Sequence, residues 1–350
     1  MFTNLKPMLA KKSLVSLTAL LSTAVLGVAL FSPREGLSIQ KLLEEKSYNS
    51  ISGREGKDGP VLVVKIDDTR MAHPQIGVEF ADVVYIEQVE GGLTRLAAVY
   101  SSYIPREIGP VRSARISDLE LIAQYGKVGF AYSGAQSKLR PEIESANLFD
   151  LGAQSMSSTI YTTDSTRTPP FAMVLRADLL LEYASQRGYE FSISKNMGWN
   201  FSEETELGLP ITSAKIDWPA SSYEAQWSQS DRVWKLKHNG NSNVSSTGSV
   251  LTADTFVIQI VSITDSIYKD KVGGITPFSA TVGTGRGYIL RDGKFIEGIW
   301  TRLSAESGTT WRTSAGEEIP FSRGKLWVAL TDKEPIFTPH FEDAGDSRTK

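Results

Sequence analysis

The sequence predicts an α+β fold, in which a mixed α/β N-terminal domain precedes a β-rich C-terminal domain. Two observations carry this prediction. Between residues 60 and 200, short apolar strand-like runs alternate with amphipathic helix-like stretches. From residue 210 the helical periodicity disappears, and short β-prone runs separated by turn residues continue to residue 332. We therefore expect two domains, at 60–200 and 210–332, followed by a polar tail at 333–350.

The chain begins with a segment suited to a membrane. Residues 13–33 contain no charged side chain, and this length exceeds the roughly 20 residues that span a bilayer as a helix. Lys6, Lys11 and Lys12 precede it and no acidic residue appears before Glu35, so the positive-inside rule places the body outside the cytoplasm. We expect residues 1–33 to form a single-pass signal-anchor in the cell membrane and 34–59 to form a linker. Cleavage as a signal peptide is the alternative.

The expected N-terminal domain reads as strands, a hairpin and helices. Gly91-Gly92 separates two strand-like runs and predicts a hairpin. Ser117 and Glu120 fit a capping box, which predicts that a helix begins there and ends before Gly126. The expected strands are 61–67, 82–90, 94–102 and 127–134, and the expected helices are 117–125, 137–146 and 176–188.

The expected C-terminal domain consists of short strands. Runs such as 232–238, 254–262 and 324–331 are rich in β-branched and aromatic residues. Asp292-Gly293, between two longer runs, is a strong signal for a two-residue hairpin turn.

Composition excludes several classes of function. The chain has no cysteine, which removes disulfides, thiolate nucleophiles, Cys-ligated zinc and a lipid-modified cysteine. A net charge of -3 and a pI near 5.8 argue against nucleic-acid binding. The three histidines, His73, His238 and His340, are scattered and none has a partner at metal-ligand spacing, so neither a zinc site nor a cofactor is expected.

Three motifs resemble those of a known family. They are ADVVYIEQVEGGLTR at 81–95, IGPVRSAR at 108–115 and GTGRGYILRDGKFIEGIW at 283–300. The first two resemble the N-terminal domain of the YerB-type bacterial lipoproteins, a family of unknown function, and the third resembles the C-terminal domain of that family. The resemblance implies an envelope location, an α/β domain and a β-rich partner domain, but no established reaction.

The chain departs from the family pattern in three ways. The family often reads Ile-Asp-Asn where this chain has Ile66-Asp67-Asp68. Family members usually carry a lipid-attachment cysteine, which is missing here, so the tether would have to be residues 13–33. The family often has a His-Asn pair after Arg-x-Ala-Pro, whereas this chain reads Arg167-Thr168-Pro169-Pro170-Phe171. Any role of that histidine cannot be transferred.

Charged residues near predicted strand ends suggest an anion site. Arg112 and Arg115 precede the expected helix, whose free N–H groups and dipole favour negative charge, and arginine suits carboxylate or phosphate. The leading hypothesis is a membrane-anchored binding or scaffolding module that recognises an anionic cell-wall ligand, with an envelope protein as a second partner. Its expected ligand-binding residues are Arg95, Arg112, Ser113, Arg115, Arg167, Asp67, Glu87 and Glu90.

Other interpretations of the same charges remain open at this point. The arginines could pair with Asp67, Glu87 or Glu90 in a structural ionic network. These acids could instead serve a cell-wall hydrolase or transferase, or hold a divalent ion through oxygen ligands. Asp67 and Asp68 are adjacent, so in a strand only one of them can face such a site. A purely structural partner of an envelope complex is the last alternative.

Overall fold

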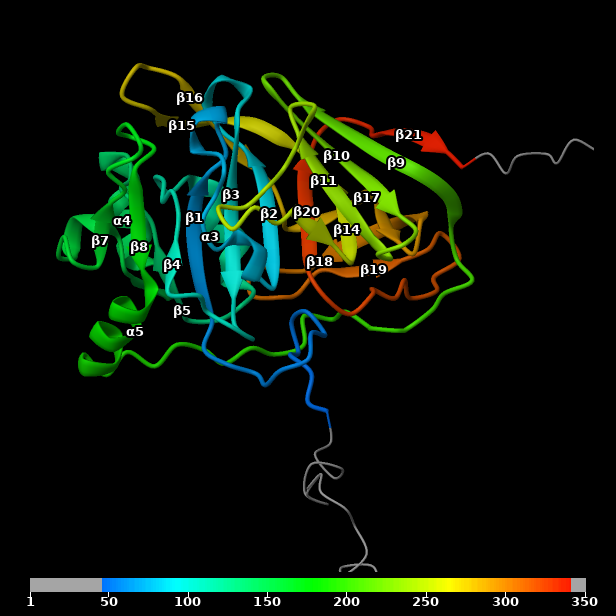
Figure 1. The fold of residues 1–350 in the computed structure, drawn as a ribbon, viewed down its shortest axis with the longest axis horizontal. Coiled ribbons are helices and arrows are strands. Elements are labelled where there is room, and N and C mark those ends of the chain that lie inside the picture. Colours follow the sequence, from blue (N-terminus) through cyan, green and yellow to red (C-terminus); the bar gives the residue numbers. More distant parts are fainter. Residues whose placement is uncertain (1–45, 341–350) are drawn as a thin grey trace, which may run out of the picture. The chain divides into compact units, whose positions relative to one another are not determined.

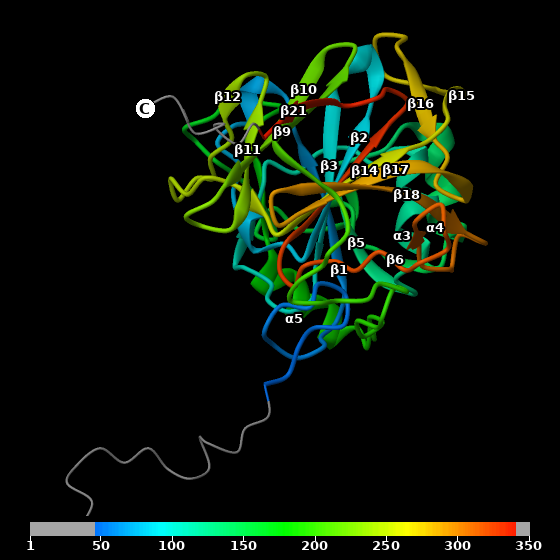
Figure 2. The ribbon, with the colours of Figure 1, turned by 90° about the vertical axis from the view of Figure 1, so that its right-hand side faces the viewer.

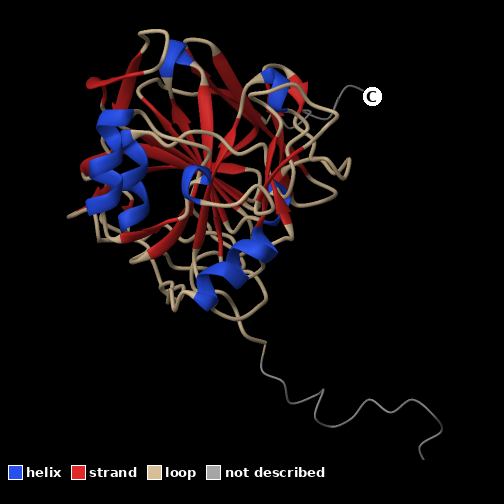
Figure 3. Ribbon diagram, turned by 90° about the vertical axis from the view of Figure 1, so that its left-hand side faces the viewer, coloured by secondary structure: helices blue, strands red, loops and turns tan. Residues whose placement is uncertain are grey.

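The fold is mostly β, which corrects the expected α+β class. The computed structural model describes residues 46–340, of which 43% lie in strands or bridges and 13% in helices. The helices are short and lie outside the strands (Figure 3). They are α3 (Ile116–Ala123), α4 (Arg140–Ser145) and α5 (Ala177–Gln186). The three expected helices are present, at 116–123, 140–145 after a 3₁₀ turn at 137–139, and 177–186, but they are short and the strands far outnumber them, so the expected class was wrong.

The four expected strands of the first half are present, and four short strands were not expected (Figure 1). The hairpin around Gly91-Gly92 is present, and both glycines have positive φ angles, of 70° and 72°. The expected strands are β1 (Leu62–Asp67), β2 (Val83–Gln88), β3 (Thr94–Tyr100) and β5 (Val128–Ala131), and the others are β4 (Glu107–Ile108), β6 (Leu148–Asp150), β7 (Tyr161–Thr163) and β8 (Met173–Arg176).

The second half is built from strands alone in the part of the chain that the structure describes. Asp292-Gly293 makes the expected turn, with φ angles of 50° and 72°. The strands are β9 (Leu209–Trp218), β10 (Ser221–Ser228), β11 (Val233–His238), β12 (Asn241–Ser242), β13 (Thr252–Ala253), β14 (Thr255–Ile260), β15 (Ile263–Lys269), β16 (Ile275–Ser279), β17 (Gly283–Arg291), β18 (Lys294–Arg302), β19 (Thr310–Arg312), β20 (Leu326–Thr331) and β21 (Ile336–Pro339).

One sheet runs through both halves. Strand β20 pairs in parallel with β14 on one side and with β2 on the other (Figure 2). The path of the sheet is β12-β11-β10-β9-β18-β17-β14-β20-β2-β3-β1-β5-β6. This pairing satisfies the edge of β2, which would otherwise present unpaired backbone groups. The domain limits near 200 and 210 stay a prediction.

The two faces of the strands β1, β2 and β3 bury different cores. Val63, Val83 and Ala97 belong to a core that includes residues of α3, whereas Val64 and Val84 belong to the core that includes residues of α5. Because side chains alternate along an extended chain, Asp67, the last residue of β1, and Asp68, which follows it, point to opposite faces. Each of them belongs to a separate polar cluster described below.

The N-terminal predictions lie largely outside the described residues. The signal-anchor at 1–33, with its span at 13–33, is not described, and within 46–340 no helix is long and apolar enough to cross a membrane. Of the stretch expected to be a linker, the part from Ser47 onward belongs to the same compact unit as the sheet, and Ile51 is fully buried. Of the expected tail, Ile336–Pro339 pairs with β9.

Candidate functional site

A row of alternating charges crosses three neighbouring strands. Arg95 on β3 is directly opposite Asp67 on β1 and Glu87 on β2 in the strand register. Directly opposed residues share one face of a sheet, which is here the face covered by α3. The antiparallel pairing of β3 with β1 and with β2 is therefore enough to bring Asp67, Glu87 and Arg95 near one another.

The segment before α3 brings two more arginines to this row. The backbone N–H of Arg112 donates to the carbonyl of Lys65, and the N–H of Asp67 donates to the carbonyl of Pro110. Helix α3 begins at Ile116, so the expected capping box of Ser117 and Glu120 is wrong. Asp118 instead accepts the N–H of Arg115 at 2.6 Å, which fixes the helix start beside the arginines.

Two of the arginines are neutralised by acids. Arg112 Nε lies 2.6 Å from Asp67 Oδ2, and Arg115 Nε lies 2.7 Å from Glu90 Oε1. The hydroxyl of Thr276 also donates to Glu90. Burial opposes ionisation of Glu90, but the hydrogen bonds and charge of Arg115 keep its pKa below the usual value. These two pairs match the ionic-network interpretation.

Arg95 differs from its neighbours. Its side chain donates a 2.8 Å hydrogen bond from Nη1 to the carbonyl of Ser113, and within the described residues no carboxylate lies within 4.0 Å of its guanidinium nitrogens. The residue is 8% exposed. Burial, together with the positive charges of Arg115 and Arg112, lowers the pKa of Arg95 to about 9. Arg95 therefore stays protonated at pH 7 in surroundings that disfavour its charge.

These side chains line a cavity of about 370 Å³. One wall comes from the β15–β16 hairpin, through Lys269, Asp270, Lys271 and Val272, which sequence reasoning did not include. Five cationic side chains and two carboxylates line the cavity, so its lining carries an excess of positive charge. We call this cavity the arginine cleft, and its lining residues are Glu90, Arg95, Arg112, Ser113, Ala114, Arg115, Ala135, Gln136, Leu139, Pro170, Tyr268, Lys269, Asp270, Lys271, Val272 and Thr276.

Glu87 belongs to a closed cluster rather than to the arginine cleft. Lys65 Nζ lies 2.5 Å from Glu87 and 2.7 Å from Asp118, and all three side chains are buried. Burial and the nearby charge of Asp118 raise the pKa of Glu87 to about 8. Lys65 and Asp118 escaped the sequence prediction, although a lysine inside the apolar run VLVVKID was a signal for a buried ion pair.

Arg167 is also placed away from the arginine cleft. Its guanidinium pairs with Asp164 at 3.0 Å and donates to the carbonyls of Ala72, at 2.7 Å, and Pro74. It therefore joins its own loop to the segment around residue 73. The ring centroid of Phe171, in the same loop, lies 5.6 Å from the guanidinium carbon of Arg112.

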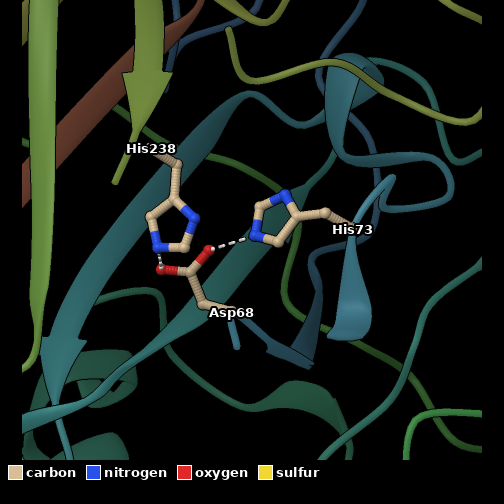
Figure 4. Close-up of side chains that lie close together, drawn as sticks. All are labelled: Asp68, His73 and His238. Atoms are coloured by element: carbon tan, nitrogen blue, oxygen red, sulfur yellow. Dashed lines mark ion pairs between the residues drawn. The ribbon is translucent and has the colours of Figure 1, made fainter. Parts of the chain in front are cut away.

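A second polar cluster lies on the opposite face of the strands. His73 and His238, which looked scattered along the sequence, both approach Asp68 (Figure 4). One ligand atom from each of the three residues lies within 4.8 Å of the others. The sequence argument against a metal site relied on spacing along the chain, which does not show that residues from distant segments meet in the fold.

Comparison with known proteins identifies relatives of both halves. Residues 49–190 match the family described as "Protein of unknown function (DUF3048) N-terminal domain", and residues 214–328 match its C-terminal domain. The chain is 22% identical over 272 residues to "Putative lipoprotein YerB" of Bacillus subtilis (strain 168), a match that covers 77% of this chain and 80% of the relative. The crystal structure of the YerB protein from Bacillus subtilis superimposes with a TM-score of 0.72 at 19% identity, over 83% of this chain and 100% of that one, which shows a shared fold.

Proposed function

The chain belongs to the DUF3048 family of proteins of unknown function, and from that premise we propose that it is an envelope-associated module that binds an anionic ligand in the arginine cleft. The observation that carries this proposal is Arg95. A buried guanidinium beside two other arginines, with no carboxylate in contact among the described residues, is an unfavourable arrangement that a bound anion would relieve.

The shape and charge of the arginine cleft support a small ligand. A volume of about 370 Å³ falls within the usual range of about 300–1,000 Å³ for ligand pockets. Arginine donates two parallel hydrogen bonds to carboxylate or phosphate, and these charge-assisted bonds are stronger than neutral ones. Lys269 and Lys271 on the β15–β16 hairpin add charge at the opposite wall. We propose that Arg95, Arg112 and Ser113 contact the anion, while Arg115 remains paired with Glu90.

The proposed ligand is a phosphate- or carboxylate-bearing component of the cell wall. Two arguments support an envelope location: the relative in Bacillus subtilis is named as a lipoprotein, and residues 13–33 have the length and composition of a membrane anchor. We propose that this single-pass anchor holds the body on the extracytoplasmic side. An envelope protein partner remains part of the proposal.

The alternative of a hydrolase or transferase gains no support from the acids. Asp67, Glu87 and Glu90 are each held by a cationic side chain at 2.7 Å or less. A general acid or base needs access to substrate, whereas Glu87 is fully buried with Lys65. The enzymatic interpretation stays a prediction.

The proposal is tested by calorimetric titration of the full-length chain in mild detergent. Two probes separate the ligand classes: a short poly(glycerol phosphate) for phosphate and a muropeptide for carboxylate. Binding of either probe should weaken in Lys271→Ala and with added salt, and should be unchanged in the control Arg106→Met, because Arg106 forms an exposed pair with Asp178 outside the cleft. Absence of binding to both probes, or equal weakening in the control, would contradict the proposal.

A further inference from the structure

The second polar cluster brings together three residues from distant parts of the chain. Asp68 follows β1, His73 follows a 3₁₀ turn at Arg70–Ala72, and His238 is the last residue of β11. His73 Nε2 lies 3.3 Å from Asp68 Oδ1, and His238 Nε2 lies 3.6 Å from Asp68 Oδ2. Figure 4 shows both imidazoles turning a nitrogen toward the carboxylate. The two rings stack with centroids 4.6 Å apart.

The surroundings of this cluster are polar and buried. Asn243 is buried beside His73 and Tyr223 and interacts with both of their side chains. Gln75 donates from Nε2 to Asp68 Oδ1 at 3.2 Å, while its side-chain oxygen is buried without a hydrogen-bond partner among the described residues. Buried polar groups are normally satisfied by protein, water or an ion, so this oxygen is available to a bound ion or to its water.

We propose that Asp68, His73 and His238 form a binding site for a divalent transition metal of the zinc class. Neutral imidazole and carboxylate are ordinary zinc ligands at about 2.0–2.2 Å, which places two tetrahedral ligands about 3.3 Å apart. The separations of 3.3 Å to Oδ1 and 3.6 Å to Oδ2 of Asp68 are close to this value, and one ligand atom from each of the three residues lies within 4.8 Å of the others, so small side-chain adjustments would bring them around one metal. Three protein ligands leave the fourth position for water or for an oxygen of a bound molecule.

The contacts of Asp68 suit a metal-bound carboxylate. The hydroxyls of Tyr223 and Thr94 donate to its two oxygens at 2.7 and 2.6 Å, and both donors are buried. Such outer contacts orient a ligand and are a regular feature of metal sites. Asp68 Oδ2 accepts a hydrogen bond from Thr94 alone among the described residues, so it keeps a lone pair for a metal.

A metal at this site would enter from the side of His73 and would link the two halves of the chain. The His73 side chain is 18% exposed while that of Asp68 is fully buried, so a metal would enter past His73. His238 and Tyr223 come from the C-terminal half, whereas Asp68 and His73 come from the N-terminal half. A bound metal would therefore tie β11 to the segment after β1, and it would stabilise the folded chain.

The test uses the full-length chain, freed of metal with a chelator and titrated with Zn²⁺ and with Co²⁺. We expect one Zn²⁺ per chain and, with Co²⁺, the visible absorption of a tetrahedral site. His238→Gln and His73→Gln should each bind roughly 100-fold more weakly or worse, since loss of outer contacts alone costs about 10–100-fold. His340→Gln is the matched control, because His340 is exposed and is the third histidine of the chain.

Three outcomes would overturn the proposal. One is absence of Zn²⁺ binding by the wild-type chain, and another is binding that His73→Gln and His238→Gln leave undiminished. The third is equal loss in His340→Gln, which would indicate adventitious binding. If His238→Gln fails to fold, the more exposed His73→Gln and the Co²⁺ spectrum of the wild type still decide the question.

Discussion

Replacing Arg95 by methionine separates a ligand site from a structural network. Methionine keeps much of the volume of the side chain but removes its charge. The pKa of Arg95 is lowered from 12.5 to about 9, which means that the folded protein disfavours the charged form of this side chain, relative to its neutral form, by roughly 5 kcal/mol. The lost hydrogen bond from the charged guanidinium to the Ser113 carbonyl costs less, about 1.5–3 kcal/mol. We therefore expect the free energy of unfolding of Arg95→Met to equal or exceed that of the wild type.

Arg115→Met provides the contrast, because it leaves Glu90 without its cation. Removal of one partner from a buried ion pair costs about 3–5 kcal/mol, so this variant should unfold at a clearly lower urea concentration. The assay is urea unfolding of the full-length chain followed by tryptophan fluorescence. In calorimetry, Arg95→Met should bind the anionic probe about 10- to 150-fold more weakly, as loss of a charged hydrogen bond predicts. Destabilisation of Arg95→Met as large as that of Arg115→Met would refute the reasoning.

Three further predictions concern the stability of the body. Lys65→Met leaves the carboxylate of Asp118 buried without a cation and removes the hydrogen bond to Glu87. It should lower the free energy of unfolding by about 3–5 kcal/mol, as measured by urea unfolding at pH 7; an unchanged midpoint would contradict the pairing. The pKa of Glu87 is raised from 4.5 in the unfolded chain to about 8 in the folded chain, so the folded chain holds an extra proton between these pH values. The free energy of unfolding of the wild type should therefore fall as the pH rises from about 5 to 8, by at most about 1.4 kcal/mol per pH unit. This pH dependence should disappear in Glu87→Gln. Gly308→Ala should lower the free energy of unfolding by about 1–3 kcal/mol, because a Cβ at this position would lie 2.0 Å from the Met197 carbonyl oxygen. The same urea unfolding curves measure this loss. If the variant is as stable as the wild type, the loop can move to make room for the methyl group.

The parts of the fold that local pattern determines were predicted correctly. The hairpin of β2 and β3 and the turn at Asp292-Gly293 depend on a few adjacent residues, and both are present. Long-range pairing was not predicted, because nothing within Leu326–Thr331 says that it joins β2 to β14. The fold class was wrong for the same reason, since the alternation of elements before residue 200 concealed a sheet that continues into the second half.

In the candidate site, too, the contacts set by neighbouring strands could be predicted, whereas the contacts between distant segments could not. Asp67, Arg95 and Glu87 are brought together by neighbouring strands, and the segment after β3 carries Arg112 and Arg115 to them, so proximity could be expected from strand ends. Which charges pair depends on tertiary contacts. The alternation of strand faces implied that Asp67 and Asp68 face opposite sides, and they contact different partners: Arg112 for Asp67, and His73 and His238 for Asp68. The β15–β16 hairpin and the meeting of two histidines come from contacts across more than 100 residues, which spacing along the chain cannot reveal.

The most direct test of an anion site in the arginine cleft is a crystal structure of the chain with a short poly(glycerol phosphate). We predict that a phosphate group lies within hydrogen-bond distance of the Arg95 guanidinium, between Arg112 and the β15–β16 hairpin, and that Arg95→Met crystals lack it. An empty cleft, with the phosphate bound elsewhere or absent while Arg95 contacts only the Ser113 carbonyl, would contradict the proposal.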